Sequence, residues 1–165
     1  MESKRVSDSS VVMAVVMQPA DANPAGNVHG GVIMKNIDSA AGVVGLRHAA
    51  CNAVTASIDR LDFHNPVYVG ELLFLKAGLN LVGKSSMEIG VRVEAENPQK
   101  RQTRHVASAY LTFVALDQNK QPAPVPGLIL ETPDERRRND EAMSRRKMRL
   151  AEKEQEKRSR LGNKK

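Results

Sequence analysis

The stretch GGVIMKNIDSAAGVVGLRHAA, residues 30–50, decides the fold that we expect from this sequence. Its apolar and small side chains recur with the period of an α-helix, at Ile33, Ile37, Ala40, Ala41, Val44 and Ala49. We therefore predict one long helix over 32–50, entered through Gly30-Gly31. Alanines and glycines crowd this segment, so a neighbouring backbone or a ligand can approach the helix closely.

On either side of this helix the pattern is that of strands, and its clearest form is a strict alternation of period two over 87–96. Further strands are expected over 11–17, 51–63, 72–82 and 106–116. Short connections favour an antiparallel sheet, and a single helix buries its apolar side by lying across the sheet. The fold class is therefore α+β: an antiparallel five-stranded sheet wrapped around one long central helix, with a charged helical tail.

The charge is concentrated at the C-terminal end of the chain. The 165 residues carry a net charge of +6, of which residues 131–165 hold +5, from 13 basic and 8 acidic side chains. Residues 1–130 are nearly neutral, so the basic pI of about 9.7 does not indicate nucleic-acid binding by the main domain. We expect a flexible N-terminal leader over 1–10, a domain over 11–130 and a tail over 131–165.

The tail begins with the sequence of a capping box. Thr132 is the expected N-cap, Pro133 the first helical residue and Glu135 the acid three positions after the cap. A helix over 133–160 follows, with acid-first pairs four residues apart, at Glu141/Arg145, Glu154/Arg158 and Glu156/Arg160. Apolar residues are few in it, which predicts a largely solvated helix.

Cysteine content and hydropathy narrow the class of protein. The single Cys51 excludes an intramolecular disulfide framework and a site of four thiolates. The apolar run over 11–17 is far shorter than a membrane-spanning helix, and no cleavage pattern follows it. We expect a cytoplasmic protein that does not insert into membranes. No metal-ligand spacing joins the histidines, and no nucleotide-binding or serine-elbow motif occurs.

Asp38 is the most informative candidate for chemistry. It lies in the middle of the expected helix, on a face formed by small and apolar residues, where an unpaired carboxylate is costly. Gly31 lies seven residues earlier, and backbone N–H groups at a helix N-terminus can stabilise an oxyanion. The two are about 10 Å apart on one helix, too far to act on one carbonyl. The spacing favours an active site shared by two copies of the chain.

Asn23 and His29 precede the helix in a loop that is rich in turn residues. The amide of Asn23 can position water or a carbonyl oxygen, but an asparagine before Pro24 is equally typical of a turn. His29 can be a base, although a residue that precedes the helix is the simpler interpretation.

The segments 18–49, 55–71, 82–93 and 107–117 together resemble hotdog-fold acyl-CoA thioesterases, a group with cytosolic brain-type enzymes and small bacterial single-domain members. The run of Asn, Gly, His-Gly-Gly and Asp over 23–38 is its most specific part. The resemblance implies hydrolysis of an acyl-CoA thioester to acid and CoA, without a metal or redox cofactor. It also implies dimers with sites between protomers, commonly as trimers of dimers, with functional residues at Asn23 and Asp38.

In this interpretation the Gly31 N–H stabilises the oxyanion, Asp38 from the other protomer activates water or attacks directly, and Asn23 orients the water or the carbonyl. CoA is anionic, so cationic and polar groups are expected along its path. The candidates for binding substrate or CoA are Gly30, His29, Lys84, Ser85, Ser86, Arg104 and Tyr68. An ordinary polar turn competes with this role for Lys84, Ser85 and Ser86.

Two other functions use the same fold. One is a non-catalytic regulator that senses acyl-CoA, with the tail touching DNA; the acids of the tail and the absence of a helix-turn-helix before the domain argue against it. The other is a hotdog hydratase or dehydratase, in which His29 and Asp38 form the usual pair of histidine and acid. The context of Asn23 and the lack of the hydratase spacing argue against this alternative.

Overall fold

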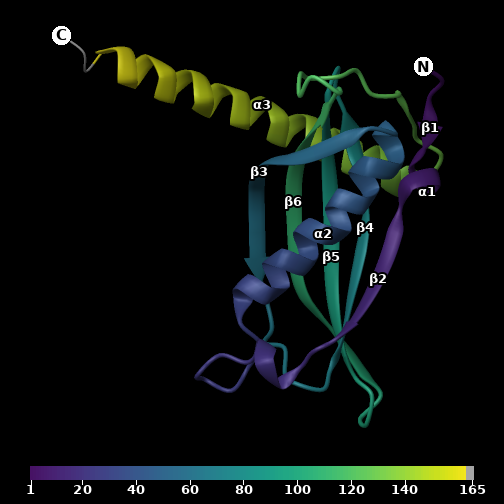
Figure 1. Ribbon diagram of the computed structural model, residues 1–165, viewed down its shortest axis with the longest axis vertical. Helices are drawn as coiled ribbons and strands as arrows, with labels where there is room; N and C mark the ends of the chain where they lie inside the picture. The colour runs from purple at the N-terminus through teal and green to yellow at the C-terminus, as the bar shows by residue number, and fades with distance from the viewer. Residues whose placement is uncertain (163–165) are drawn as a thin grey trace.

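The computed structural model describes residues 1–162 and shows a sheet with a long helix on each face (Figure 1). Its elements, in chain order, are β1 (Lys4–Arg5), α1 (Val6–Ser9), β2 (Val11–Val16), the 3-10 turn η1 (Pro19–Asp21), α2 (Gly30–Ala49), β3 (Asn52–Phe63), β4 (Leu72–Val82), β5 (Ser86–Asn97), β6 (Gln102–Leu116), β7 (Leu128–Ile129) and α3 (Pro133–Gly162).

The main sheet has five antiparallel strands in the order β2-β4-β5-β6-β3, which leaves β2 and β3 as its edges. The apolar residues of the alternating strands point to one face, which we call the inner face, and α2 lies across it. The α+β prediction is confirmed. The expected strand limits agree with the structure to within one residue, except that β6 begins four residues earlier than expected.

The central helix α2 has the expected buried face and a sharp end. Ile37, Ala40, Ala41 and Val44 are at most 1% exposed because the inner face of the sheet covers them. The helix starts at Gly30, two residues before the expected start, because His29 caps it. It ends before Ala50, whose left-handed backbone (φ 53°) stops the helical ladder.

The N-terminal segment differs from the separate leader expected over 1–10. The strand β1 pairs in parallel with β7, and Val6 and Ser9 of α1 are buried. The Lys4 ammonium donates to the His48 carbonyl at 2.8 Å, at the C-terminal end of α2. Sequence reasoning missed this arrangement because two strands of two residues, far apart in the chain, leave no periodic pattern.

The tail helix α3 has the expected capping box: the Glu135 N–H donates to Thr132 Oγ1, and the Thr132 N–H donates to Glu135 Oε2, both at 3.1 Å. Its first half is largely exposed but also packs, along one side, on the outer face of the sheet, opposite α2 (Figure 1). Ala142 is fully buried there, and Arg145 and Arg149 bond carboxylates of the sheet. The prediction of a largely solvated helix is confirmed for most of its residues, but it did not include this docking on the sheet.

Many basic side chains of the tail are paired with acids. Among residues 131–162, five arginines have carboxylate partners: Arg137, Arg138, Arg145, Arg149 and Arg158. The expected pairs Glu141–Arg145 and Glu154–Arg158 form, at 3.9 and 3.2 Å, whereas within residues 1–162 no ion pair joins Glu156 to Arg160. None of the helices in the described part of the chain is long and apolar enough to span a membrane.

Candidate active site

Asp38 is held by a residue of the neighbouring strand. It lies in the third turn of α2, and its Oδ1 accepts a hydrogen bond of 2.5 Å from the Thr55 hydroxyl of β3. Asp38 is partly exposed and Thr55 is exposed, so the pair faces the surface and not the core. Thr55 was not among the residues expected from the sequence; its only signal there is its place on the strand that follows the helix.

Both α2 and the edge strand β3 also carry exposed apolar side chains. Met34, Val43 and Leu46 of α2 are exposed, and so are Val54 and Ile58 of β3. β3 is bonded to β6 on one side only, so its other edge offers free backbone donors and acceptors. An exposed apolar surface beside a free strand edge is typical of a contact between protein chains.

Of the two backbone N–H groups of the glycine pair at the start of α2, one already has a hydrogen-bond acceptor within the chain. The Gly31 N–H donates to Nδ1 of His29 at 2.9 Å, so it differs from the free oxyanion donor expected from the sequence. The His29 ring therefore acts as the N-cap of α2, whereas the sequence indicated only a residue that precedes the helix. Within residues 1–162, no acceptor is found for the Gly30 N–H.

The side chain of Asn23 folds back on its own loop. Its Oδ1 accepts from the Ala25 N–H at 2.9 Å, and its Nδ2 donates to Asn27 Oδ1 at 2.5 Å. In one copy of the chain Asn23 thus has the turn role that its sequence context equally supports. The loop returns directly to the helix start, because the His29 N–H donates to the Asp21 carbonyl at 2.8 Å.

The turn with Lys84, Ser85 and Ser86 lies at the opposite end of the sheet from Gly30. Gly30 packs against the ring of Phe63, at the end of β3, whereas Ser86 and the start of β3 share their register on β6. About nine residues of β3 separate the two ends, which is roughly 30 Å. A single copy therefore does not bring this turn to the start of α2.

Arg104 is engaged inside the chain. Its guanidinium donates to both carboxylate oxygens of Glu71, at 2.6 and 2.8 Å, and to the Pro66 carbonyl at 2.7 Å, and it lies 5.7 Å from the ring of Tyr68. Burial acts to raise the pKa of Glu71, but the hydrogen bonds from Arg104 and the Tyr68 N–H outweigh burial and leave this pKa lowered. Arg104 thus fixes the loop that joins β3 to β4, and its role in CoA binding stays a prediction.

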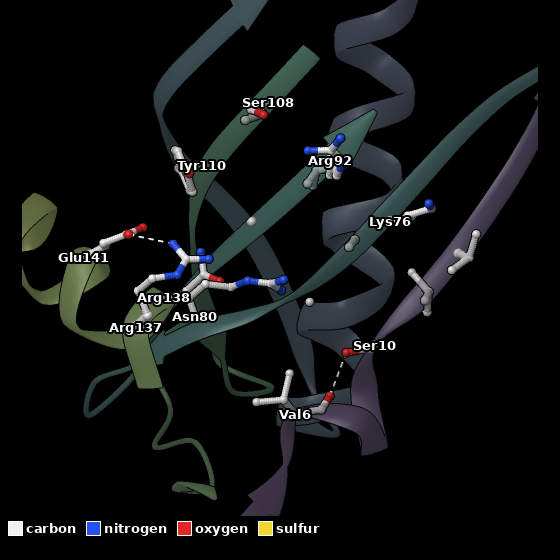
Figure 2. A pocket seen from close by; sticks show the side chains of 17 residues that line it. Val6, Ser10, Lys76, Asn80, Arg92, Ser108, Tyr110, Arg137, Arg138 and Glu141 are labelled. Carbon is white, nitrogen blue, oxygen red and sulfur yellow. Dashed lines mark hydrogen bonds and ion pairs between the residues drawn. The ribbon is translucent and has the colours of Figure 1, made fainter. Parts of the chain in front are cut away.

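A groove of about 520 Å³ lies on the outer face of the sheet (Figure 2), and Asp38 is not among the residues that line it. Its cations are already paired: Lys76 and Arg92 with Glu94, and two arginines of α3 with acids of the same helix. In the described residues, no group of three or more His, Cys, Asp and Glu side chains is placed to hold a metal ion.

Comparison with known proteins places these features in one family. Residues 25–101 match the thioesterase superfamily. The chain is 40% identical over 148 residues to the cytosolic acyl coenzyme A thioester hydrolase of Rattus norvegicus, covering 87% of this chain but 38% of that relative. It is 37% identical to a protein of Bacillus subtilis named as an uncharacterized acyl-CoA thioester hydrolase, with 81% and 78% covered.

Solved structures agree with this assignment over nearly the whole chain. An acyl-CoA hydrolase from Staphylococcus aureus, solved with butyryl coenzyme A and coenzyme A, has a TM-score of 0.89 and 33% identity, covering 98% of this chain and 99% of that one. Alanine variants of that hydrolase, at one asparagine, one aspartate and one threonine, are also solved. A hexameric acyl-CoA thioesterase has a TM-score of 0.89 and 32% identity, with 92% and 97% covered. The chain therefore belongs to the acyl-CoA thioester hydrolase family of the thioesterase superfamily, with its hotdog fold.

Proposed function

We propose that this chain hydrolyses acyl-CoA thioesters to a free carboxylic acid and CoA, at a site that two copies complete. The observation that carries the proposal is the pair of Asp38 and Thr55 at 2.5 Å, which joins the helix α2 to the edge strand β3. The cytosolic relatives span more than twice the length of this chain, so they support the reaction class and not the complete activity.

The spacing of the variants in the Staphylococcus aureus hydrolase supports the choice of residues. In that protein the substituted aspartate lies 15 residues after the asparagine and 17 residues before the threonine. Asn23, Asp38 and Thr55 have the same two separations in this chain. We therefore add Thr55 to the proposed site as a residue that positions the carboxylate.

In the proposed reaction, Asp38 removes a proton from a water molecule as its oxygen attacks the thioester carbonyl carbon. The C–S bond then breaks, and the CoA thiolate leaves with the proton that Asp38 had taken. Thr55 holds Oδ1, so Oδ2 is the oxygen that handles the proton. The Gly30 N–H, and the Gly31 N–H if His29 releases it, are the donors proposed for the oxyanion. This route needs no metal or redox cofactor.

The two ends of the sheet explain why a second copy is needed. When two β3 edges pair in antiparallel fashion, the Lys84–Ser86 turn of one copy approaches the α2 start of the other. That turn, with Lys84 as its cation, is the proposed contact for CoA phosphates, together with His29 and Tyr68 on the opposite side. Assembly into a trimer of dimers is proposed from the hexameric neighbour, and a cytoplasmic location from the relatives named cytosolic.

The test is release of free thiol from a panel of acyl-CoAs of different chain length. Asp38→Asn keeps the shape of the side chain but removes the base, so we expect kcat to fall by about 10²–10⁴-fold with the fold and CoA binding retained. Thr55→Val should lower kcat by about tenfold, because the carboxylate of Asp38 then loses the hydrogen bond that holds it in place.

Thr112→Val is the matched control, because Thr112 donates a similar 2.7 Å bond to Asp59 on the outer face and should leave kcat unchanged. Wild-type turnover by Asp38→Asn would remove the assigned base. Acyl-CoA binding without any turnover by the wild type would instead favour the acyl-CoA-sensing regulator.

A further inference from the structure

The helix α3 crosses the outer face of the sheet one strand after another. Asn139 donates to the Asn80 carbonyl of β4 at 2.7 Å, and Arg145 pairs with Glu88 of β5 at 2.7 Å. Arg145 also lies 3.8 Å from the ring of Tyr110 on β6, and Arg149 pairs with Asp59 on the edge strand β3. Successive residues along α3 therefore contact β4, β5, β6 and β3 in that order, so the helix runs from the interior of the sheet to its free edge.

Beyond Arg149 the helix continues past this edge (Figure 1). The eleven residues after Arg149, up to Arg160, extend it by about 16 Å, at 1.5 Å per residue. Strands in a sheet are about 4.8 Å apart, so this length corresponds to about three strands. All side chains over 151–160 are exposed in the single chain.

The row of side chains that faces the sheet continues into this exposed segment. With 3.6 residues per turn, Glu152 and Glu156 lie within about 20° of Arg145 around the helix axis, whereas Glu154 lies about 180° from it. Arg145, Arg149, Glu152 and Glu156 line a cavity of about 390 Å³ with the outer side of β3. This cavity lies against the edge strand β3, and residues 1–162 supply no further strand beyond that edge.

We infer that residues 151–160 form a strap that lies across the outer sheet face of a second copy. The inference rests on the proposed pairing of two β3 edges, which would continue the sheet directly under the projecting helix. In a two-fold dimer each copy gives one strap and receives one. A helical end of this length is marginally stable alone, and the partner's sheet would cover the face that the row presents.

Charge also favours a second copy as the occupant. The sheet-facing row carries Glu152 and Glu156, Lys153 lines the same cavity beside them, and the outer side of β3 carries the exposed Arg60 and the partly exposed Asp62, so both surfaces are of mixed sign. Mixed charges on both surfaces suit two copies of one chain, whereas a nucleic acid or an anionic membrane would need a uniformly basic row.

The first test removes the strap and keeps the contacts that dock α3. A chain that ends at Leu150 retains Asn139, Arg145 and Arg149. Two differently labelled populations are mixed, and the exchange of subunits between them is followed by energy transfer. We expect exchange to be at least tenfold faster in the shortened chain. An unchanged exchange rate, or a full-length chain that is monomeric at all concentrations, would overturn the inference.

The second test reverses one charge on either side of the helix. Glu156→Lys changes the row that faces the partner and should speed exchange about fivefold, whereas Glu154→Lys makes the same charge change on the opposite side and should stay within twofold. Equal effects of the two variants would contradict the strap.

Hydrogen exchange of the amides over 151–160 provides the readout inside the assembly. We expect protection in the full-length dimer and its loss in the Glu156→Lys variant. If these amides exchange hydrogen as fast as in an unfolded chain, in a dimer that still hydrolyses acyl-CoA, the strap is disproved and the proposed function is not. If the protein does not hydrolyse acyl-CoA but the expected changes in subunit exchange and amide protection are found, only the proposed function is disproved. Protection that requires added DNA or lipid vesicles would replace the second copy by that partner.

Discussion

The two long helices cover the two faces of one sheet by different means. On the inner face, α2 buries aliphatic and small side chains such as Ile33, Ile37 and Val44 among the apolar residues of the strands. On the outer face, α3 buries Ala142 and is otherwise held by Asn139, Arg145 and Arg149, each bonded to a polar group of the sheet.

The difference teaches which forces locate each helix. Burial of apolar surface is strong and has little directionality, so it can be read from the period of the sequence. Ion pairs between largely buried groups are directional and repay their desolvation only when the geometry is right. We therefore expect the inner helix to determine stability and the outer helix to depend on a few specific contacts.

The largest stability effect is expected in the inner helix. Ile37 is 1% exposed, so Ile37→Ala leaves a cavity in the core and should lower the free energy of unfolding by about 2–5 kcal/mol. Urea denaturation measures this change. Met143→Ala on the exposed side of α3 is the control and should change it by less than about 0.5 kcal/mol. Similar losses in both variants would abolish the contrast between the helices.

The next effect concerns the ion pair that docks the outer helix. The side chain of Glu88 is 2% exposed, and Glu88→Gln leaves the partly buried Arg145 without its carboxylate, at an expected cost of about 1–3 kcal/mol. Replacing both partners together, by Glu88→Leu with Arg145→Met, should recover part of this loss because no charge then stays unpaired. If the double variant has a lower free energy of unfolding than Glu88→Gln, the unpaired charge is not the main cause of the loss, and the expectation is wrong.

A smaller effect is expected from His48, buried at the C-terminal end of α2. Burial lowers the pKa of His48 below its ordinary value of 6.5, although its Nε2 lies 2.9 Å from the Pro126 carbonyl. The unfolded chain then binds more protons than the folded chain just below pH 6.5. Stability should therefore be full above pH 6.5 and decline as the pH falls below it.

Chemical denaturation of the wild type and of His48→Gln at a series of pH values isolates this contribution. The slope between pH 6.5 and 5.5 should be smaller in the variant. An equal slope in both proteins would assign the pH dependence to other groups.

The smallest effect is expected for the exposed pair of Glu154 and Arg158, 3.2 Å apart. Glu154→Gln should change the free energy of unfolding by less than about 0.5 kcal/mol, because water and salt screen both side chains. Thermal denaturation at low and high salt checks this expectation. A loss near that of Glu88→Gln would mean that the far half of α3 is as firmly held as the near half.

The sequence was sufficient for the parts of the fold that have a period. The alternation over 87–96 located β5, and the helical repeat located α2 with its buried face. It was not sufficient for the docking of α3, because hydropathy does not register a helix that is held by arginines. Nor did it indicate the pairing of β1 with β7, which depends on residues more than 120 positions apart.

The candidate site divides in the same way. Asp38 was identified because a carboxylate on a small, apolar helix face is costly and needs a reason. Its partner Thr55 was not, since a threonine in a strand is ordinary and only the fold brings its hydroxyl within 2.5 Å of Asp38. The bond from the Gly31 N–H to His29 was also beyond reach, because it depends on the orientation of one ring.

The pairing of β1 with β7 brings the first residues of the chain beside the segment that precedes α3. Proteins whose ends lie close together tolerate circular permutation, in which the old ends are joined and new ends are opened elsewhere. Here a short linker between the residues before β1 and those after β7 would close the domain into a ring. The new ends could be opened in the exposed turn over 98–101. The helix α3 would then no longer be joined to the chain after β7, so it could be supplied as a separate peptide.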